Sequence, residues 1–327
     1  MKKSLIALAV LAASGAAMAQ STVTLYGIAD LWVGSAKSTG GSRVTLMESG
    51  GVNGSRWGLK GSEDLGGGLK ANFDLQAGFA MDTGAAGSAT ASAFSRQSWV
   101  GFSGGFGALR LGRTTTPYDD VSGAADAVFD SALAPANAVF KSTKYSGRQN
   151  NMFYYQAPNF GGVSGALSYS LDEKSAANDE VTSVNVTYAG GPLGLHLAFQ
   201  NQQNSARTYD VDFLRLGGSF NFGMATLKAN YGEAKNYQLK GGKTKDFQIG
   251  VDVPMGSALT LSASYAKSDD NATAGDASRD GFGVAAAYTL SKRTFLYGGF
   301  RHDEDDKGPA AATVKTDVFA IGVQHRF

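Results

Sequence analysis

The chain has no cysteine among its 327 residues, and it has only three histidines. The first absence excludes disulfide bridges and thiolate metal sites, so stability must come from backbone pairing and packing. The histidines, His196, His302 and His325, do not have the spacing of a metal-ligating pair. No Gly-x-Ser-x-Gly elbow lies between a buried strand and a helix, and the glycine cluster at 101–107 has the setting of a turn. The sequence therefore predicts no catalytic residue, no metal and no cofactor.

An excess of basic charge is also missing. Lys2 and Lys3 precede a short apolar run, and Ala17-Met18-Ala19 follow it, which is the pattern of a secretory signal peptide cleaved before Gln20. A transmembrane anchor is the alternative, but such an anchor needs about 20 apolar residues. Without the two lysines, 27 basic residues stand against 28 acidic ones. This balance gives no reason to expect a nucleic-acid partner.

No stretch after residue 19 is long and apolar enough for a membrane helix, although 43% of the residues are hydrophobic and only 17% are charged. Instead, a period-two alternation runs from Thr22 to Phe327. In the last strand Phe319, Ile321 and Val323 share one face, and small or polar residues share the other. A membrane protein without helical spans must be a closed barrel, because only closure satisfies every backbone hydrogen bond.

The alternation predicts about sixteen strands, an even number within the range of outer-membrane barrels. Its outward apolar rows include Trp57 and Trp99, and Ser55 is also expected outward. Short turns rich in Gly, Asn and Pro are expected in the periplasm, at 63–68, 103–107, 158–162, 189–194, 221–223, 254–257 and 290–293. Longer polar loops are expected outside the cell, at 35–53, 81–93, 114–146, 172–180, 202–209, 236–244, 268–278 and 303–314. We expect one domain over residues 20–327, after a signal peptide at residues 1–19.

The third long segment differs from the others. Between Pro117 and Pro135, the residues from Asp119 to Leu133 have apolar side chains at a helical rather than a strand period. An apolar face needs a surface to cover it. The inner wall of the barrel is the nearest such surface, so the loop is expected to fold inward and narrow the lumen. The alternative is packing outside, against the rim or a neighbouring subunit.

With these residues in view, the chain resembles the general porins of Gram-negative outer membranes, of the Burkholderia, Comamonas and Neisseria type. The resemblance covers nearly all of the chain. It depends on the C-terminal phenylalanine and on VTLYGIAD (23–30), SRWGLKGSEDLGGGLKANFDLQ (55–76), FSRQSWVGF (94–102), FGALRLGR (106–113), PNFGG (158–162) and LSKRT (290–294). It implies a 16-stranded antiparallel transmembrane β-barrel, an inward-folded third extracellular loop and a homotrimer. The PEFGG sequence of enterobacterial porins is missing from that loop, so only the loop's position and acidity carry over.

Five basic residues are candidates for the pore lining. Strand parity points Arg56, Arg96 and Arg148 into the lumen, the last in step with Asn150. Arginines at matching positions in the related porins lie on the wall opposite the loop, so these three resemble the basic half of a constriction. Lys60 and Arg110 are expected nearer the periplasmic mouth. The plainer alternative is that each is a solvated lumen residue without a special field.

The acidic half is expected on the constriction loop, which contains Tyr118, Asp119, Asp120, Asp126 and Asp130. Carboxylates facing guanidinium groups across a narrow opening create a transverse field. Helix capping or simple solvation are alternatives, because the first two aspartates sit at the start of the predicted helix.

The sequence thus predicts an outer-membrane channel for passive diffusion of ions and small hydrophilic solutes, with a mild preference for anions. A homotrimer is expected, with small outward residues such as Gly27, Ala29 and Gly101 allowing close subunit contact. The other expected partners are membrane lipid, lipopolysaccharide and the solutes themselves. One alternative is a channel that prefers particular solutes, such as organic anions or sugars. A phospholipase-like barrel would need a lipid-facing Ser-His pair, and a plugged structural or adhesive barrel would need about eight strands.

Overall fold

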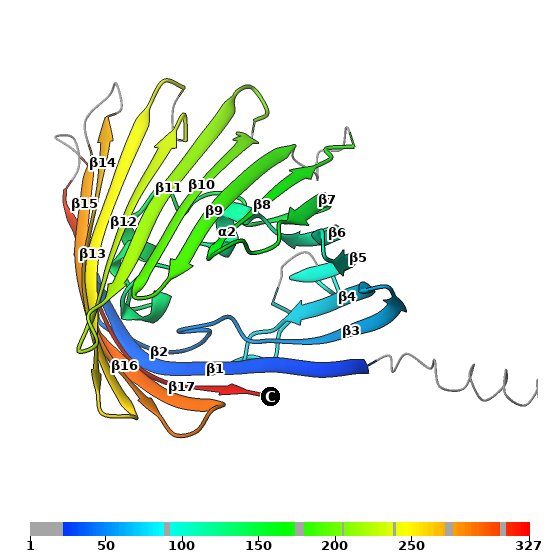
Figure 1. The fold of residues 1–327 in the computed structure, drawn as a ribbon. Coiled ribbons are helices and arrows are strands. Elements are labelled where there is room, and N and C mark those ends of the chain that lie inside the picture. Colours follow the sequence, from blue (N-terminus) through cyan, green and yellow to red (C-terminus); the bar gives the residue numbers. More distant parts are fainter. Residues whose placement is uncertain are drawn as a thin grey trace, which may run out of the picture.

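A computed structural model of the protein describes residues 22–87, 92–173, 180–204, 206–237, 240–271, 277–307 and 312–327. The predicted signal peptide, residues 1–19, lies outside these residues. Within them, no helix has the length and apolar character needed to cross a membrane. Strands make up most of the described chain, and they follow one another around a single wall (Figure 1).

The strands of the first half are β1 (Thr22–Ser38), β2 (Val44–Ser49), β3 (Arg56–Gly66), β4 (Leu69–Gly78), β5 (Gln97–Gly104), β6 (Gly107–Thr115), β7 (Arg148–Gln156) and β8 (Val163–Ser170). Those of the second half are β9 (Val181–Gly190), β10 (Leu193–Gln203), β11 (Asp210–Asn221), β12 (Thr226–Lys235), β13 (Lys243–Met255), β14 (Leu259–Asn271), β15 (Ser278–Thr289), β16 (Thr294–Asp306) and β17 (Val314–Arg326). The seven predicted short turns fall between paired strands.

The wall closes on itself through β1. One edge of β1 pairs with β17, and its other edge pairs with both β2 and β3, which lie in line along it. The seventeen segments therefore form sixteen antiparallel staves, and the predicted fold class is confirmed. Gly27 and Phe327 exchange two backbone hydrogen bonds at the seam, of 3.0 and 3.1 Å. The predicted loop at 35–53 was too long, because β1 continues to Ser38 and β2 occupies residues 44–49.

The two faces of the wall differ as the alternation predicts. On β10, Leu195 and Leu197 are exposed on the outer face, whereas His196 and Gln200 are buried on the inner one. The same pattern recurs on the other long strands, so the outer face is apolar and the inner face is largely polar. An apolar band of this kind is what hydrocarbon requires of a barrel.

Trp99 is an exception to the prediction. Val100 and Phe102 form the exposed row of β5, so Trp99 and Gly101 point into the lumen. The Trp99 ring lies beside the lumen-facing Arg110, with 5.1 Å from the guanidinium carbon to the ring centroid. Its size and apolarity suggested a lipid-facing position, but strand register decides the face. The outward assignment of Trp99 was therefore wrong, and so was the outward position of Gly101.

The long β6–β7 connection, residues 116–147, does not contain the predicted continuous helix over 119–133. It forms α2 (Pro117–Asp120), the 3-10 turn η1 (Val128–Asp130) and α3 (Pro135–Val139). Positive φ angles of 60°, 64° and 49° at Val128, Phe129 and Asp130 interrupt any right-handed helix. Pro117 and Pro135, predicted to flank one helix, instead stand in the first turn of two short helices. We call this connection the constriction loop.

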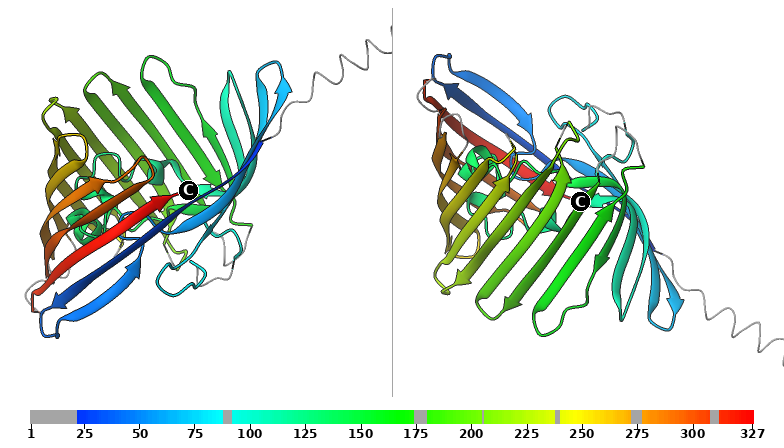
Figure 2. Two further views of the ribbon diagram at one scale, coloured as in Figure 1. Left: turned by 90° about the horizontal axis from the view of Figure 1, so that it is seen from below. Right: turned by 90° about the horizontal axis from the view of Figure 1, so that it is seen from above.

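The constriction loop lies inside the ring of strands, as both views in Figure 2 show. Inward-facing side chains of the wall accept hydrogen bonds from the backbone N–H groups of the constriction loop. Tyr118 donates to Ser183 Oγ of β9 at 3.0 Å, and Ser142 donates to Asp246 Oδ2 of β13 at 2.6 Å. Farther along the barrel, Val128 donates to an inward serine of β14 at 2.7 Å. These bonds satisfy donors that would otherwise be buried without partners.

Apolar packing, together with a glycine on the barrel wall, also holds the constriction loop against that wall. Val128 and Leu133 pack against inward residues of the wall that include Trp32. At Gly250 of β13 an added Cβ would lie 2.4 Å from the Cβ of Ala127, so only glycine lets the loop approach the wall this closely. The wall therefore supplies the covering surface that the apolar side of the loop requires.

Candidate pore constriction

Three arginines lie at the beginnings of strands β3, β5 and β7, beside the constriction loop. Arg56 is the first residue of β3, Arg96 precedes the first residue of β5, and Arg148 is the first residue of β7. The positive charge of Arg148 acts on both of the others, and on Arg113 of β6 as well, so these guanidinium groups share one region of the pore. Arg96 is fixed by a 2.8 Å hydrogen bond from its Nε to Gln76 Oε1. All three side chains are partly exposed, so they can meet a solute.

A buried carboxylate fixes the segment that precedes Arg56 in the chain. Asp30 of β1 accepts the backbone N–H groups of residues 51–53, with distances of 2.9 to 3.1 Å. Ser55, predicted to face outward, is buried instead and bonds both the amide and the carbonyl of Asp30. The break between β2 and β3 is thereby pinned to the inner side of the wall. Arg56 follows this pinned segment directly.

Strand parity is not what places Arg148. The ladder between β6 and β7 shifts register between Gly112 and Thr114, and Asn151 on β7 has a φ of 50°. Gln149 rather than Arg148 shares the buried inner row at that point. Arg148 comes to the lumen because it directly follows the constriction loop. The alternation that predicted the position of Arg148 is thus interrupted by this register shift.

One loop aspartate faces the arginines. Oδ2 of Asp119 lies 3.9 Å from Nη2 of Arg148, and Oδ1 accepts a 2.9 Å hydrogen bond from the Tyr145 hydroxyl. Burial raises the pKa of Asp119, and the charge of Arg148 acts in the opposite direction. Gly147 leaves room for this arrangement, since a Cβ there would lie 2.4 Å from Asp119 Oδ1. Thr116, not an aspartate, is the helix cap.

The other three aspartates have partners elsewhere. Asp120 accepts the Thr115 hydroxyl at 2.7 Å and the Tyr154 hydroxyl at 2.6 Å. Asp126 is buried against the wall and accepts the side-chain amide of Gln248 of β13. Asp130 accepts the side-chain amide of Asn137 at 3.1 Å. The basic side of the constriction therefore has three charges. Asp119 lies 3.9 Å from one of them, whereas the exposed Asp120 carboxylate is bound by two hydroxyls.

Asp126 and Asp130 interact with each other through a side-chain hydrogen bond. Burial raises the pKa of Asp126 to about 8, and the negative charge of Asp130 contributes to the rise. Asp126 is therefore the carboxyl that holds a proton at neutral pH and donates it to its neighbour. A protonated carboxyl adds no charge to the pore.

Tyr118 does not face the channel. Its side chain is fully buried, and its hydroxyl lies 3.2 Å from the carbonyl oxygen of Ser142. The guanidinium carbon of Arg215, on β11, is 5.1 Å from the centroid of the Tyr118 ring, and Nη1 of Arg215 donates to the carbonyl of Ser122. Arg215 is a site residue that was not predicted from the sequence. Its inward parity was the only available signal, and parity alone does not separate a loop anchor from a pore-lining charge.

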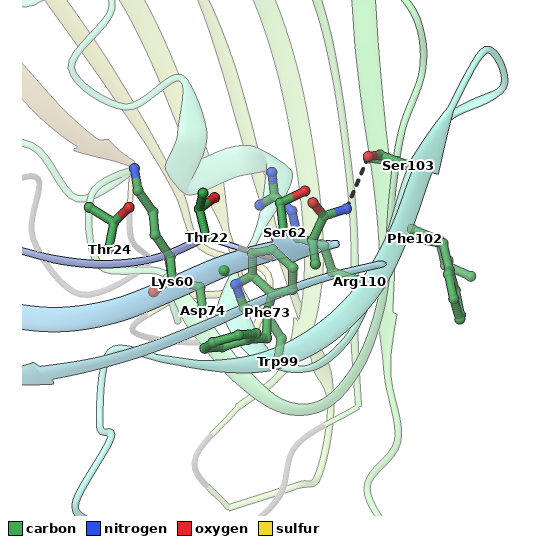
Figure 3. A pocket seen from close by; sticks show the side chains of 14 residues that line it. Thr22, Thr24, Lys60, Ser62, Phe73, Asp74, Trp99, Phe102, Ser103 and Arg110 are labelled. Atoms are coloured by element: carbon green, nitrogen blue, oxygen red, sulfur yellow. Dashed lines mark hydrogen bonds between the residues drawn. The ribbon is translucent and has the colours of Figure 1, made fainter. Parts of the chain in front are cut away.

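Lys60 and Arg110 lie apart from the constriction, on the side of the short turns. Nζ of Lys60 is 5.0 Å from the centroid of the Tyr26 ring. The guanidinium carbon of Arg110 is 5.1 Å from the Trp99 ring and 4.7 Å from the Tyr154 ring. Both cations line a cavity of about 340 Å³ on the inner wall (Figure 3).

The described residues contain no group of three His, Asp or Glu side chains arranged to hold a metal ion. His196, on β10, is buried on the inner face, away from lipid. A phospholipase-like site would need this imidazole on the outer face beside a serine. The geometry therefore gives no support to that alternative.

Comparison with known proteins agrees with this architecture. The family model described as Gram-negative porin matches residues 5–308. The chain is 37% identical to outer membrane porin protein 32 of Delftia acidovorans, over 99% of this chain and 95% of that protein. It is 31% identical to an outer membrane porin protein of Bordetella pertussis over the full length of both. Among solved structures, the anion-selective porin from Comamonas acidovorans superposes with a TM-score of 0.79 at 29% identity, covering 94% of this chain and all of that one.

Proposed function

The chain belongs to the Gram-negative porin family and forms a passive, water-filled channel through the outer membrane, and we propose that this channel prefers anions. One observation carries the proposal, namely the inequality of charge at the constriction. Arg56, Arg96 and Arg148 converge on the lumen, whereas Asp119 is the loop carboxylate beside them. The similarity of the chain to the anion-selective porin of Comamonas acidovorans is consistent with the same preference.

The strength of the preference follows from dielectric and distance. A unit charge about 4 Å from an ion contributes about 1 kcal/mol in bulk water, and more beside a low-dielectric wall. Because three guanidinium groups act together, a passing anion is favoured over a cation of the same size. Water in the channel keeps the preference for anions modest. Salt screens the electrostatic attraction within about 8 to 10 Å at physiological ionic strength.

Planar-bilayer recording tests the proposal. Single channels in a gradient of potassium chloride should reverse at a potential that corresponds to chloride preference. The offset should shrink as ionic strength rises, since mobile ions screen the arginines. A reversal potential of the opposite sign at neutral pH would reject the proposal and assign control of the constriction to Asp119.

We also propose a homotrimer held in the membrane by lipid and lipopolysaccharide around its outer band, and no catalytic activity. Family membership and the outward small residue Ala29 support the trimer. The Phe327 ring covers Gly27, and Gly101 faces the lumen, so neither glycine contributes to it. Cross-linking in mild detergent, compared before and after heating, should give a trimer that dissociates to a monomer. A monomer under mild conditions would refute this part.

A further inference from the structure

The lumen wall below the constriction combines aromatic rings with cations. Tyr26, Trp99 and Tyr154 come from three separate staves, and each ring has a cation over it at 4.7 to 5.1 Å. We call this group of Tyr26, Lys60, Trp99, Arg110 and Tyr154 the aromatic wall. Lumen faces of large barrels are generally polar, so an indole here is unusual. Figure 3 shows Lys60, Trp99 and Arg110 lining the same cavity.

The side chains of the two cations of the aromatic wall make no ion pair within 4.0 Å and no hydrogen bond among the described residues, and they lie over aromatic rings. The carboxylate of Asp74, opposite Lys60 on β4, lines the same cavity and its charge acts on both cations. The acid nearest to them along the strands, Asp74, accepts the Tyr26 hydroxyl at 2.5 Å. The five N–H donors of a guanidinium are a strong demand for an acceptor. No side-chain hydrogen bond to Arg110 occurs among the described residues, so its donors are available to water or a solute in this cavity.

The aromatic wall is continuous with the constriction. The Tyr154 hydroxyl donates to Asp120 of the constriction loop at 2.6 Å, and the Tyr154 ring lies over Arg110. Arg110 in turn lies beside Trp99. A solute that leaves the arginine cluster therefore meets these rings and cations next, on its way to the end of the barrel with the short turns.

We propose that the aromatic wall is a binding subsite for small aromatic carboxylates. Arg110 and Lys60 offer charge-assisted hydrogen bonds to the carboxylate, and the edge or free face of Trp99 offers a stacking surface to the ring. The cavity of about 340 Å³ is within the size range of small-molecule sites. This inference rests on the proposed anion preference, which brings carboxylates through the constriction. It adds a substrate class that a ring of charges alone would not select.

Benzoate, cyclohexanecarboxylate and acetate provide a graded test in planar bilayers. Benzoate added to open channels should reduce the chloride current and add binding noise. Acetate, which lacks the ring, should not produce this, and the non-planar cyclohexanecarboxylate should bind more weakly than benzoate. Equal behaviour of benzoate and acetate would overturn the subsite, whereas a cation-preferring reversal potential would instead overturn the proposed function.

Two variants locate the effect. Trp99→Leu should weaken benzoate block by about threefold to tenfold, as expected for the loss of one aromatic contact, and leave the chloride reversal potential unchanged. Trp57→Leu is the matched control, since Trp57 is exposed on the outer face. Lys60→Gln should weaken block by benzoate without altering the wall's packing. Benzoate block that survives both Trp99→Leu and Lys60→Gln would place the binding site elsewhere.

Discussion

The guanidinium of Arg148 lies 3.9 Å from the carboxylate of Asp119, and both side chains remain partly exposed to the lumen. This pair joins the two ends of the constriction loop, because Asp119 lies in its first turn, α2, and Arg148 directly follows its last residue. The carboxylate offsets part of the positive field of the arginine cluster. Its removal should therefore strengthen anion preference rather than weaken it.

The variant Asp119→Asn tests this directly. The anion-to-cation permeability ratio should rise by about twofold to fivefold, since one charge at about 4 Å contributes about 1 kcal/mol in water. Reversal potentials in a salt gradient measure the ratio. Asp126→Asn makes the same chemical change in the same loop at a buried position, so it should leave the ratio at neutral pH unaltered. An unchanged ratio for Asp119→Asn would remove Asp119 from the constriction.

The double variant Arg96→Gln with Arg148→Gln should lower anion preference while the barrel assembles normally. Neither side chain belongs to the outer apolar band, and the backbone hydrogen bonds that join the strands do not involve side chains. We expect the permeability ratio to fall by more than either single change produces. Failure of this variant to assemble, or an unaltered ratio, would contradict the assignment of these arginines to the constriction.

Leu216→Arg is the control for assembly. Leu216 lies midway along β11 on the exposed outer face, next to the inward Arg215. A charge facing lipid near the midplane costs about 2–4 kcal/mol. Folding yield in detergent should drop for this variant and stay near wild type for the arginine double variant.

The variant Gly250→Val tests how the constriction loop is seated. A Cβ at Gly250 would lie 2.4 Å from the Cβ of Ala127, so a larger side chain must push the loop away from the wall and into the lumen. Single-channel conductance should fall, and overpacking should destabilise the loop's seat by about 1–3 kcal/mol. Gly194→Val is the control, because an added Cβ there meets only the rotatable hydroxyl of Ser219. Equal conductance in both variants would mean that the loop does not narrow the channel.

Much of the barrel could be predicted from sequence because lipid imposes a simple rule. Every outward position in mid-strand must be apolar, so rows such as Leu195 and Leu197 mark each stave. The rule fails where the polarity of a side chain does not decide whether it faces lipid or the lumen. Trp99 is apolar yet points to the lumen, because the register of β5 is set by its neighbours and the ring finds a cation there.

The constriction loop was less predictable, and the reason is conformational. Its apolar spacing fitted a helix, but Val128, Phe129 and Asp130 adopt positive φ angles that no sequence pattern signals in residues other than glycine. Tertiary contacts hold them there, such as the bond from the Val128 amide to Ser262, 134 residues away. Which aspartate meets the arginines depends on those long-range contacts, so the choice among the four required the structure.

The last prediction concerns pH. The pKa of Asp126 in the folded protein is about 8, against about 3.9 for an unfolded aspartate. The folded state therefore binds more protons than the unfolded state between these values, and its stability falls as pH rises through that window. Denaturant unfolding in detergent, followed by tryptophan fluorescence from about pH 6 to about pH 9, should show this decline. In Asp126→Asn the side-chain amide cannot ionise, and its oxygen can still accept the hydrogen bond from Gln248. The decline in stability with rising pH should therefore be smaller. Parallel pH profiles for the two proteins would show that Asp126 is already ionised at neutral pH, and that its negative charge then counts against the three arginines.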